Sequence, residues 1–137
     1  MRPELDAKLR ANYPLIFTAE PIADPDDPDL PATPSPFASW GFECGDGWYD
    51  LVDTLCAALQ IETKNGAPQV LALQVKEKLG GLRFHARGQN EVHEGMIGLA
   101  EMLSVRLCEV CGNRGSILRD GGIRTRCAEH QHTGDVI

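Results

Sequence analysis

The stretch Val70-Leu-Ala-Leu-Gln-Val75-Lys-Glu-Lys-Leu-Gly80-Gly-Leu-Arg-Phe84-His-Ala-Arg87 sets the class of fold that this chain adopts. Apolar and polar residues alternate on both sides of Gly80-Gly81, which predicts a β-hairpin with strands at 70–75 and 82–87. Period-2 alternation assigns one face to the apolar residues Leu71, Leu73, Val75, Leu82, Phe84 and Ala86. The opposite face, called here the basic sheet face, carries Lys76, Lys78, Arg83, His85 and Arg87 beside Gln74.

Helical periodicity is present on both sides of the hairpin. Before it, apolar residues recur at helical spacing, namely Trp48, Leu51, Val52, Leu55, Cys56 and Leu59. After it, Asn90 is the expected cap of a second helix whose apolar side is Val92, Met96, Leu99, Leu103 and Leu107. We therefore predict an α+β fold in which a small antiparallel sheet packs on two main helices.

The N-terminal third differs in composition from this core. Residues 1–20 predict a short helical arm, with Leu5, Leu9 and Tyr13 on one side. Residues 21–39 include six of the nine prolines and an Asp/Pro run at 24–29, which indicates an extended linker. The predicted organisation is an arm (1–20), a linker (21–39), an α+β core (40–107) and a C-terminal module (108–132).

The C-terminal module has the spacing of a four-ligand zinc site. Cys108 and Cys111 form a C-x-x-C pair, and Cys127 and His130 follow as a C-x-x-H pair. The segment between them reads as a hairpin around Asp120-Gly121-Gly122. Knuckle, hairpin and the first turn of a helix would make a treble-clef-like zinc module. Four protein ligands leave no open position, so the predicted Zn²⁺ is structural.

Two alternatives to this ligand set stay open in the sequence. His132 could replace His130 if the final helical turn is shifted by two residues. The cysteines could also be ordinary reduced residues near an unrelated histidine, which the matched spacings disfavour.

Composition limits the setting and the classes of partner. The chain has 137 residues and a net charge of −7, with three basic and twelve acidic residues in 1–62 against ten and eight in 63–137. An acidic chain is a poor non-specific duplex binder. The start has no apolar run and no stretch approaches membrane-spanning length, so we expect a cytoplasmic protein that does not bind a membrane. The reducing setting would suit thiolate zinc ligands.

Three segments together resemble a group of small bacteriophage and prophage proteins. They are Cys44-Gly-Asp-Gly-Trp48, Lys76-Glu-Lys-Leu-Gly-Gly-Leu-Arg-Phe84, and the C-terminal Cys108-Glu-Val-Cys-Gly112 with Cys127-Ala-Glu-His130. The likeness covers about residues 40–132. It implies a zinc site and a bacterial host cell, and no reaction. Small phage proteins of this size often bind a host protein or defence complex, which makes a host protein the expected partner.

Three classes of function follow from these observations. In the first, the protein is not an enzyme and binds an acidic partner through the basic sheet face, although that face could also be ordinary solvated surface shielded by the acidic linker. In the second, the runner-up, the C-terminal module binds nucleic acid through Arg114, Arg119, Arg124 and Arg126. In the third, Cys44 is a nucleophile with His85 as its base, but nothing in the sequence brings the two together.

Overall fold

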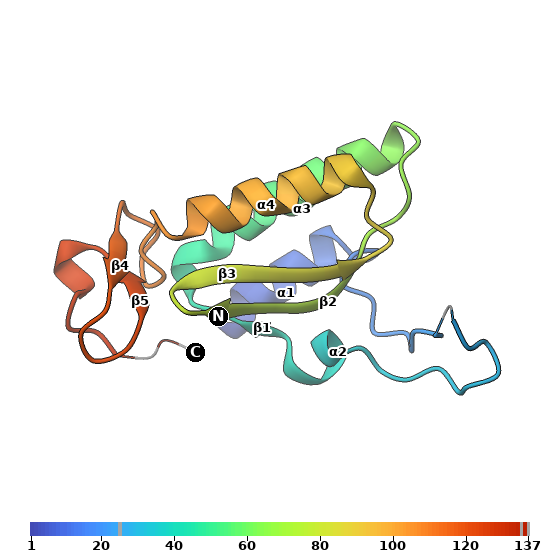
Figure 1. Ribbon diagram of the computed structural model, residues 1–137, viewed down its shortest axis with the longest axis horizontal. Coiled ribbons are helices and arrows are strands. Elements are labelled where there is room, and N and C mark those ends of the chain that lie inside the picture. The colour runs from blue at the N-terminus through green and yellow to red at the C-terminus, as the bar shows by residue number, and fades with distance from the viewer. Residues whose placement is uncertain (25, 135, 137) are drawn as a thin grey trace.

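The computed structural model describes residues 1–24, 26–134 and 136, so Pro25 within the predicted linker lies outside the described residues. Two helices, α3 (Tyr49–Lys64) and α4 (Glu91–Ser104), run side by side along one side of a three-stranded sheet (Figure 1). The sheet contains β1 (Phe42–Glu43), β2 (Leu71–Lys78) and β3 (Gly81–Arg87) in that order. A separate two-stranded sheet, β4 (Ser116–Leu118) with β5 (Arg124–Arg126), lies at one end of the molecule (Figure 1). The α+β prediction is confirmed.

The predicted hairpin forms, with one change of phase. Strands β2 and β3 pair antiparallel from Leu71↔Arg87 to Lys78↔Gly81, with an irregularity between Ala72 and Gln74. The extra residue, Leu73, shifts the alternation, so that Val70 and Ala72 are buried while Leu71 and Leu73 are half-buried. The assignment of Leu71 and Leu73 to the buried face is therefore wrong, because a β-bulge exchanges the faces of the residues that precede it.

The outer edge of β3 is covered by α4. The backbone N–H of Leu82 donates to Ser104 Oγ at 2.8 Å, and that of Phe84 donates to Glu101 Oε1 at 2.9 Å. These side chains satisfy groups that an open strand edge would leave unpaired. At the opposite edge of the sheet, β1 pairs with β2 in parallel. The sequence pattern did not predict strand β1.

Helix α4 begins as predicted but faces the other way. Asn90 caps it through a reciprocal capping box with His93. Its buried residues are His93, Ile97, Ala100 and Ser104, whereas Val92, Leu99 and Leu103 are exposed. These three residues share one side of the helix, as predicted, but that apolar side does not pack on the core. The short side chains of Ala100 and Ser104 let α4 approach β3 closely. Ser104 has to face β3 because its hydroxyl accepts the backbone N–H of Leu82.

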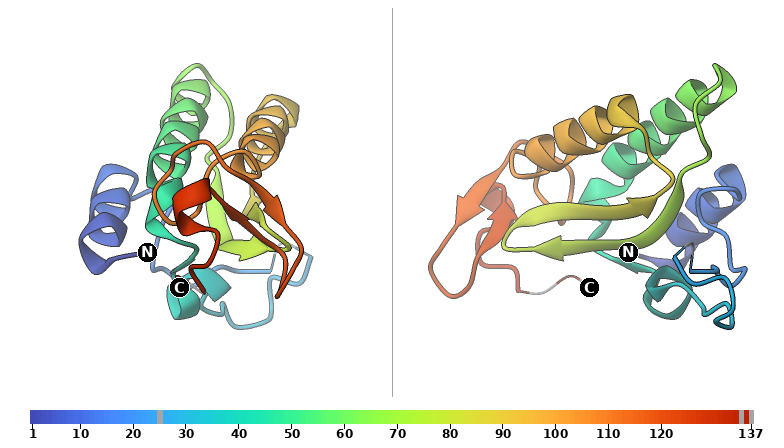
Figure 2. Two further views of the ribbon diagram at one scale, coloured as in Figure 1. Left: turned by 90° about the vertical axis from the view of Figure 1, so that its left-hand side faces the viewer. Right: turned by 45° about the vertical axis from the view of Figure 1, so that its right-hand side comes forward.

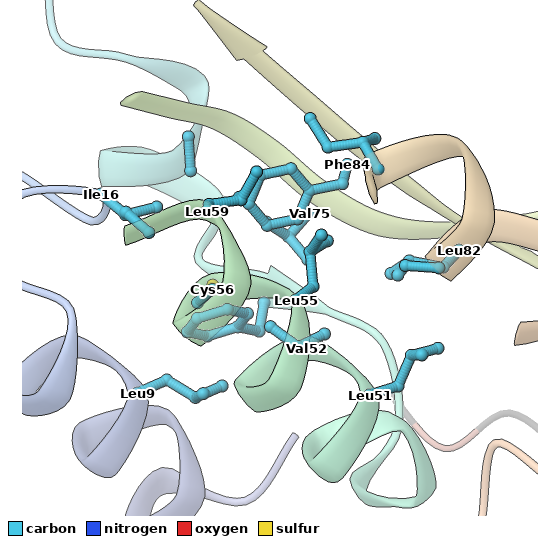
Figure 3. Packing of buried hydrophobic residues seen from close by; sticks show 14 of the residues in the cluster. Leu9, Ile16, Leu51, Val52, Leu55, Cys56, Leu59, Val75, Leu82 and Phe84 are labelled. Carbon is cyan, nitrogen blue, oxygen red and sulfur yellow. The ribbon is translucent and has the colours of Figure 1, made fainter. Parts of the chain in front are cut away.

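The N-terminal third is packed into the core. Helix α1 (Pro3–Asn12) contributes Leu9, the following turn contributes Ile16 and Phe17, and the short helix α2 (Pro36–Trp40) contributes Phe37; all four are buried. Figure 3 shows Leu9 and Ile16 among residues of α3 and the sheet, with Cys56 on the buried side of α3. The C-terminal part of the predicted linker is therefore a core element.

All four phenylalanines of the chain form one aromatic cluster. Phe17 lies with its ring centroid 4.9 Å from those of Phe37 and Phe42 and 6.5 Å from that of Phe84. The Arg10 guanidinium lies over the Phe37 ring at 4.5 Å from its centroid. The cluster joins α2, β1 and β3 to the turn after α1. Among the described residues, none of the helices has the length and apolar character that a membrane crossing needs.

Candidate metal centre

The four predicted ligands come together at the end of the molecule. The ligand atoms of Cys108, Cys111, Cys127 and His130 all lie within 4.8 Å of one another. His130 Nδ1 lies 3.2 Å from Cys127 Sγ and 3.7 Å from Cys108 Sγ, and Cys111 Sγ lies 3.8 Å from Cys127 Sγ. Three thiols and one imidazole in this arrangement fit a tetrahedral metal ion of borderline softness. His132 is exposed and does not belong to the cluster.

Each half of the cluster is held by local backbone structure. Cys108 follows α4, and its carbonyl accepts the N–H of Gly112 at 2.7 Å, which closes the knuckle that carries Cys111. Gly112 has φ +79°, a left-handed conformation that favours glycine. Strand β5 leads directly into Cys127, and a 3₁₀ turn, η2 (Ala128–His130), brings His130 back to it. A single 3₁₀ turn thus replaces the predicted first turn of a helix.

The backbone around Cys108 favours its thiolate. Burial opposes ionisation of this thiol, but backbone N–H groups of Cys127, Cys111 and Val110 and the His130 side chain together lower its pKa to about 7. Metals bind the thiolate form, so this backbone favours the ligand form of Cys108. At Cys111, burial and the neighbouring thiols Cys108 and Cys127 raise the pKa instead.

The segment Gly45–Trp48 forms the surface on which the knuckle rests. A Cβ atom added to Gly47 would lie 2.1 Å from the Cys108 carbonyl oxygen and 2.7 Å from the Cys111 nitrogen. The Gly47 N–H donates to the Glu109 carbonyl at 2.8 Å, and the buried Trp48 indole N–H donates to the Leu107 carbonyl at 2.9 Å. The glycine is required because the two backbones are in direct contact.

A buried ion pair joins the two halves of the C-terminal module and ties them to the core. Glu109 Oε2 lies 3.3 Å from Arg126 Nη1, and both side chains are almost fully buried. The second oxygen, Glu109 Oε1, accepts the N–H of Gly45 at 3.0 Å. Burial raises the pKa of the Glu109 carboxyl, and these two partners oppose that rise.

The hairpin tip is the third contact between the core and the C-terminal module. The Thr125 hydroxyl of β5 donates to the Gly80 carbonyl at 2.6 Å, and both residues are buried. Gly80 has φ +81°, and its N–H donates to Glu77 Oε1 at 2.7 Å. The segments 44–48 and 76–84 therefore both contact the C-terminal module. Each segment contains two glycines, Gly45 and Gly47 in the first and Gly80 and Gly81 in the second. This was the sequence signal that could have indicated a close backbone contact.

The predicted residues of the basic sheet face share one face of the β2–β3 hairpin. Lys76 lies opposite Arg83, Lys78 opposite Gly81 and His85 opposite Gln74. Lys78 and His85 are exposed, and Lys76, Arg83 and Arg87 are half-buried. Arg87 donates to the Ala23 carbonyl at 3.0 Å and lines a groove with residues of the linker, so the linker covers this end of the face.

Other candidate residues of the sequence are placed apart or are already engaged. Cys44 is buried, and burial raises the pKa of its thiol to about 12, whereas His85 is exposed on the basic sheet face. Arg126 is buried, and Arg124 donates to backbone carbonyls of the β4–β5 turn and of Gln131. Of the four arginines in the C-terminal module, Arg114 and Arg119 are exposed.

Comparison with known proteins adds no relative: no family model matches this chain, and neither a curated protein nor a solved structure is significantly similar to it.

Proposed function

We propose that this protein is a zinc-stabilised binding protein of phage type, which acts by contact with a host protein and not by catalysis. The metal is a structural Zn²⁺ held by Cys108, Cys111, Cys127 and His130 in a treble-clef-like module. The partner contacts the basic sheet face, and its own surface is acidic. The setting is the cytoplasm of a bacterial host cell, as the phage-like sequence pattern implies.

The observation that carries this proposal is a group of cations on one sheet face that form no ion pair among the described residues, although the register places Glu43 of β1 beside Lys76 on this face. Among the described residues, the ion pairs involve Arg2, Arg10 and Arg126, and none involves the basic sheet face. In Figure 1, α1 lies behind β2 and β3, α3 and α4 lie above them, and no described helix covers the side turned to the viewer. Cations held on a sheet at fixed spacing suit carboxylate groups of a partner surface.

The zinc supports this role through the fold. Three contacts, at Gly47, Gly45 and Gly80, join the C-terminal module to the core that carries β2 and β3. The ion would therefore stabilise the hairpin that presents the basic sheet face. With four protein ligands the metal has no position left for a substrate.

The test is capture of partners from a bacterial lysate with a tagged protein, with and without nuclease. The double variant Lys76→Glu/Lys78→Glu should lose a nuclease-resistant protein partner. The matched control, Lys8→Glu/Lys64→Glu, makes the same charge change on α1 and α3 and should retain it. Equal metal content and equal melting temperatures would show that both variants are folded. Retention of the partner by the first variant would exclude the basic sheet face as its binding surface.

A second candidate function is nucleic-acid binding through Arg114 and Arg119, both exposed beside the metal cluster. It predicts a partner that is lost with nuclease and an affinity that falls steeply with salt. The variant Arg114→Glu/Arg119→Glu would abolish that binding and leave a protein partner unaffected.

A further inference from the structure

Helix α4 turns its larger apolar side chains away from the core of its own chain. Val92, Leu99, Met102 and Leu103 are 50%, 68%, 71% and 42% exposed, while the buried side of the helix includes His93 and Ser104. A surface helix of a monomer normally has the opposite arrangement, with its large apolar residues inside. The exposed set, together with half-buried Met96, is called here the α4 outer surface.

The α4 outer surface is continuous with an apolar groove between α3 and α4. Leu51, Leu55 and Ala58 of α3 line this groove together with Met96, Leu99 and Leu103 of α4. A neighbouring hollow joins Leu99, Met102 and Leu103 to Arg106, just beyond the end of α4. Figure 2 shows α3 and α4 next to each other with no described segment over their outer side.

We infer that the α4 outer surface is a twofold interface on which a second copy of this chain binds through its own α4, with the two helices antiparallel. Val92, Leu99 and Arg106 follow one another at intervals of seven residues, so all three lie along one side of the helix. If the twofold axis passes beside Leu99, the Leu99 side chains of the two copies are in contact. The same axis places Met96 opposite Met102 of the second copy.

The charges at the two ends of α4 are complementary in this arrangement. Glu91 and Glu94 are in the first turn, and Arg106 is exposed one residue after the C-cap. An antiparallel pair brings Arg106 of each copy beside Glu91 and Val92 of the other. The helix dipoles oppose each other, which also favours the antiparallel pair over the parallel one. In a parallel pair, Glu91 would meet Glu91 and Arg106 would meet Arg106.

The size of the surface fits a reversible dimer. The four exposed side chains present roughly 400 Å² of apolar surface, which matches the largest patches that monomers leave in water. A twofold contact through these side chains alone would cover roughly 800 Å², which is below the roughly 1,000 Å² of the smallest specific interfaces. The charged ends of α4 and the α3 side of the groove would have to supply the remaining area. We therefore expect dissociation in the micromolar range.

Sedimentation equilibrium of the full chain, from about 1 to 100 µM, tests the interface. The wild type should show a monomer–dimer equilibrium, and Leu99→Glu should weaken it at least tenfold. The matched control is Leu15→Glu, which introduces the same charge at a leucine that is 58% exposed outside α4. It should dimerise as the wild type does. Both positions are exposed, so both variants should keep their metal and their melting temperature.

A charge exchange tests the antiparallel geometry. Glu91→Arg and Arg106→Glu should each weaken the dimer, and the double variant should restore it. A wild type that is monomeric over the whole range would overturn the inference, and capture of a different protein in a Leu99-dependent manner would then assign the surface to that partner. A dimer that survives Leu99→Glu would place the interface elsewhere. Failure of the double variant to recover would exclude the antiparallel pairing.

Discussion

Adding a single methyl group at Gly47 should separate the C-terminal module from the core. In Gly47→Ala, the new Cβ would lie 2.1 Å from the Cys108 carbonyl oxygen and 2.6 Å from the Gly112 nitrogen. These are backbone atoms of the knuckle, so no side-chain rotation relieves the overlap. The knuckle has to move away, and the metal ligands Cys108 and Cys111 move with it.

The expected magnitude follows from the contacts that this movement breaks. The hydrogen bonds from Gly47 N–H to Glu109 and from the Trp48 indole to Leu107 contribute about 1 kcal/mol each. Steric overpacking adds about 1–3 kcal/mol. The free energy of unfolding should fall by about 3–5 kcal/mol, a large part of the stability of a small domain. If metal binding requires the docked knuckle, the dissociation constant for Zn²⁺ should rise by at least a hundredfold.

Urea denaturation followed by Trp48 fluorescence measures the loss. Trp48 is buried at the contact, and Trp40 is largely exposed, so a Trp40→Phe background isolates the Trp48 signal. The matched control is Gly98→Ala in α4, where an added Cβ meets no atom within 4 Å. It should stabilise the protein by about 0.5–1 kcal/mol through higher helix propensity. Equal stability and equal metal affinity of Gly47→Ala and the wild type would refute the close contact.

Three further predictions concern the core, the thiols and the fourth ligand. Phe37→Ala should cost about 3–5 kcal/mol in urea denaturation, as Phe84→Ala should, because both rings belong to the aromatic cluster; a cost below 1 kcal/mol would contradict the burial of α2. In the metal-loaded protein at pH 8, iodoacetamide should modify Cys44 roughly a thousandfold more slowly than an ordinary thiol, because a pKa of about 12 leaves the thiol protonated. The rate should rise with pH as long as the protein stays folded, and a fast reaction at pH 8 would show an accessible thiolate. His130→Ala should lose bound metal after dialysis, measured by elemental analysis, whereas His132→Ala should retain it; the reverse pattern would assign the fourth ligand to His132.

Local sequence patterns predicted the elements whose residues repeat regularly. Helix α3 and the β2–β3 hairpin were visible in their apolar spacing, and Asn90 marked the start of α4. The ligand set was visible because C-x-x-C and C-x-x-H turns bring their side chains together without help from the rest of the chain.

Features that depend on contacts between residues far apart in the sequence could not be predicted from local patterns. The buried side of α4 is set by the edge of β3, which needs the hydroxyl of Ser104 and the carboxylate of Glu101. The apolar side that includes Leu99 was predicted as a group, but its hydrophobicity did not show that it is exposed. Helix α2 follows a proline-rich segment, and its burial depends on a single residue, Phe37. The need for glycine at 47 arises from a backbone sixty residues further along the chain.

The buried pair of Glu109 and Arg126 limits how this sequence can change during evolution. Loss of one partner leaves an uncompensated charge in the interior, which costs about 3–5 kcal/mol, whereas replacing both by apolar residues of similar volume is often neutral. Single substitutions at either position would thus be removed by selection, and viable change requires both positions together. Among descendants of this sequence, positions 109 and 126 should covary, and a lineage that has lost both charges should also have repacked the contact at Gly45.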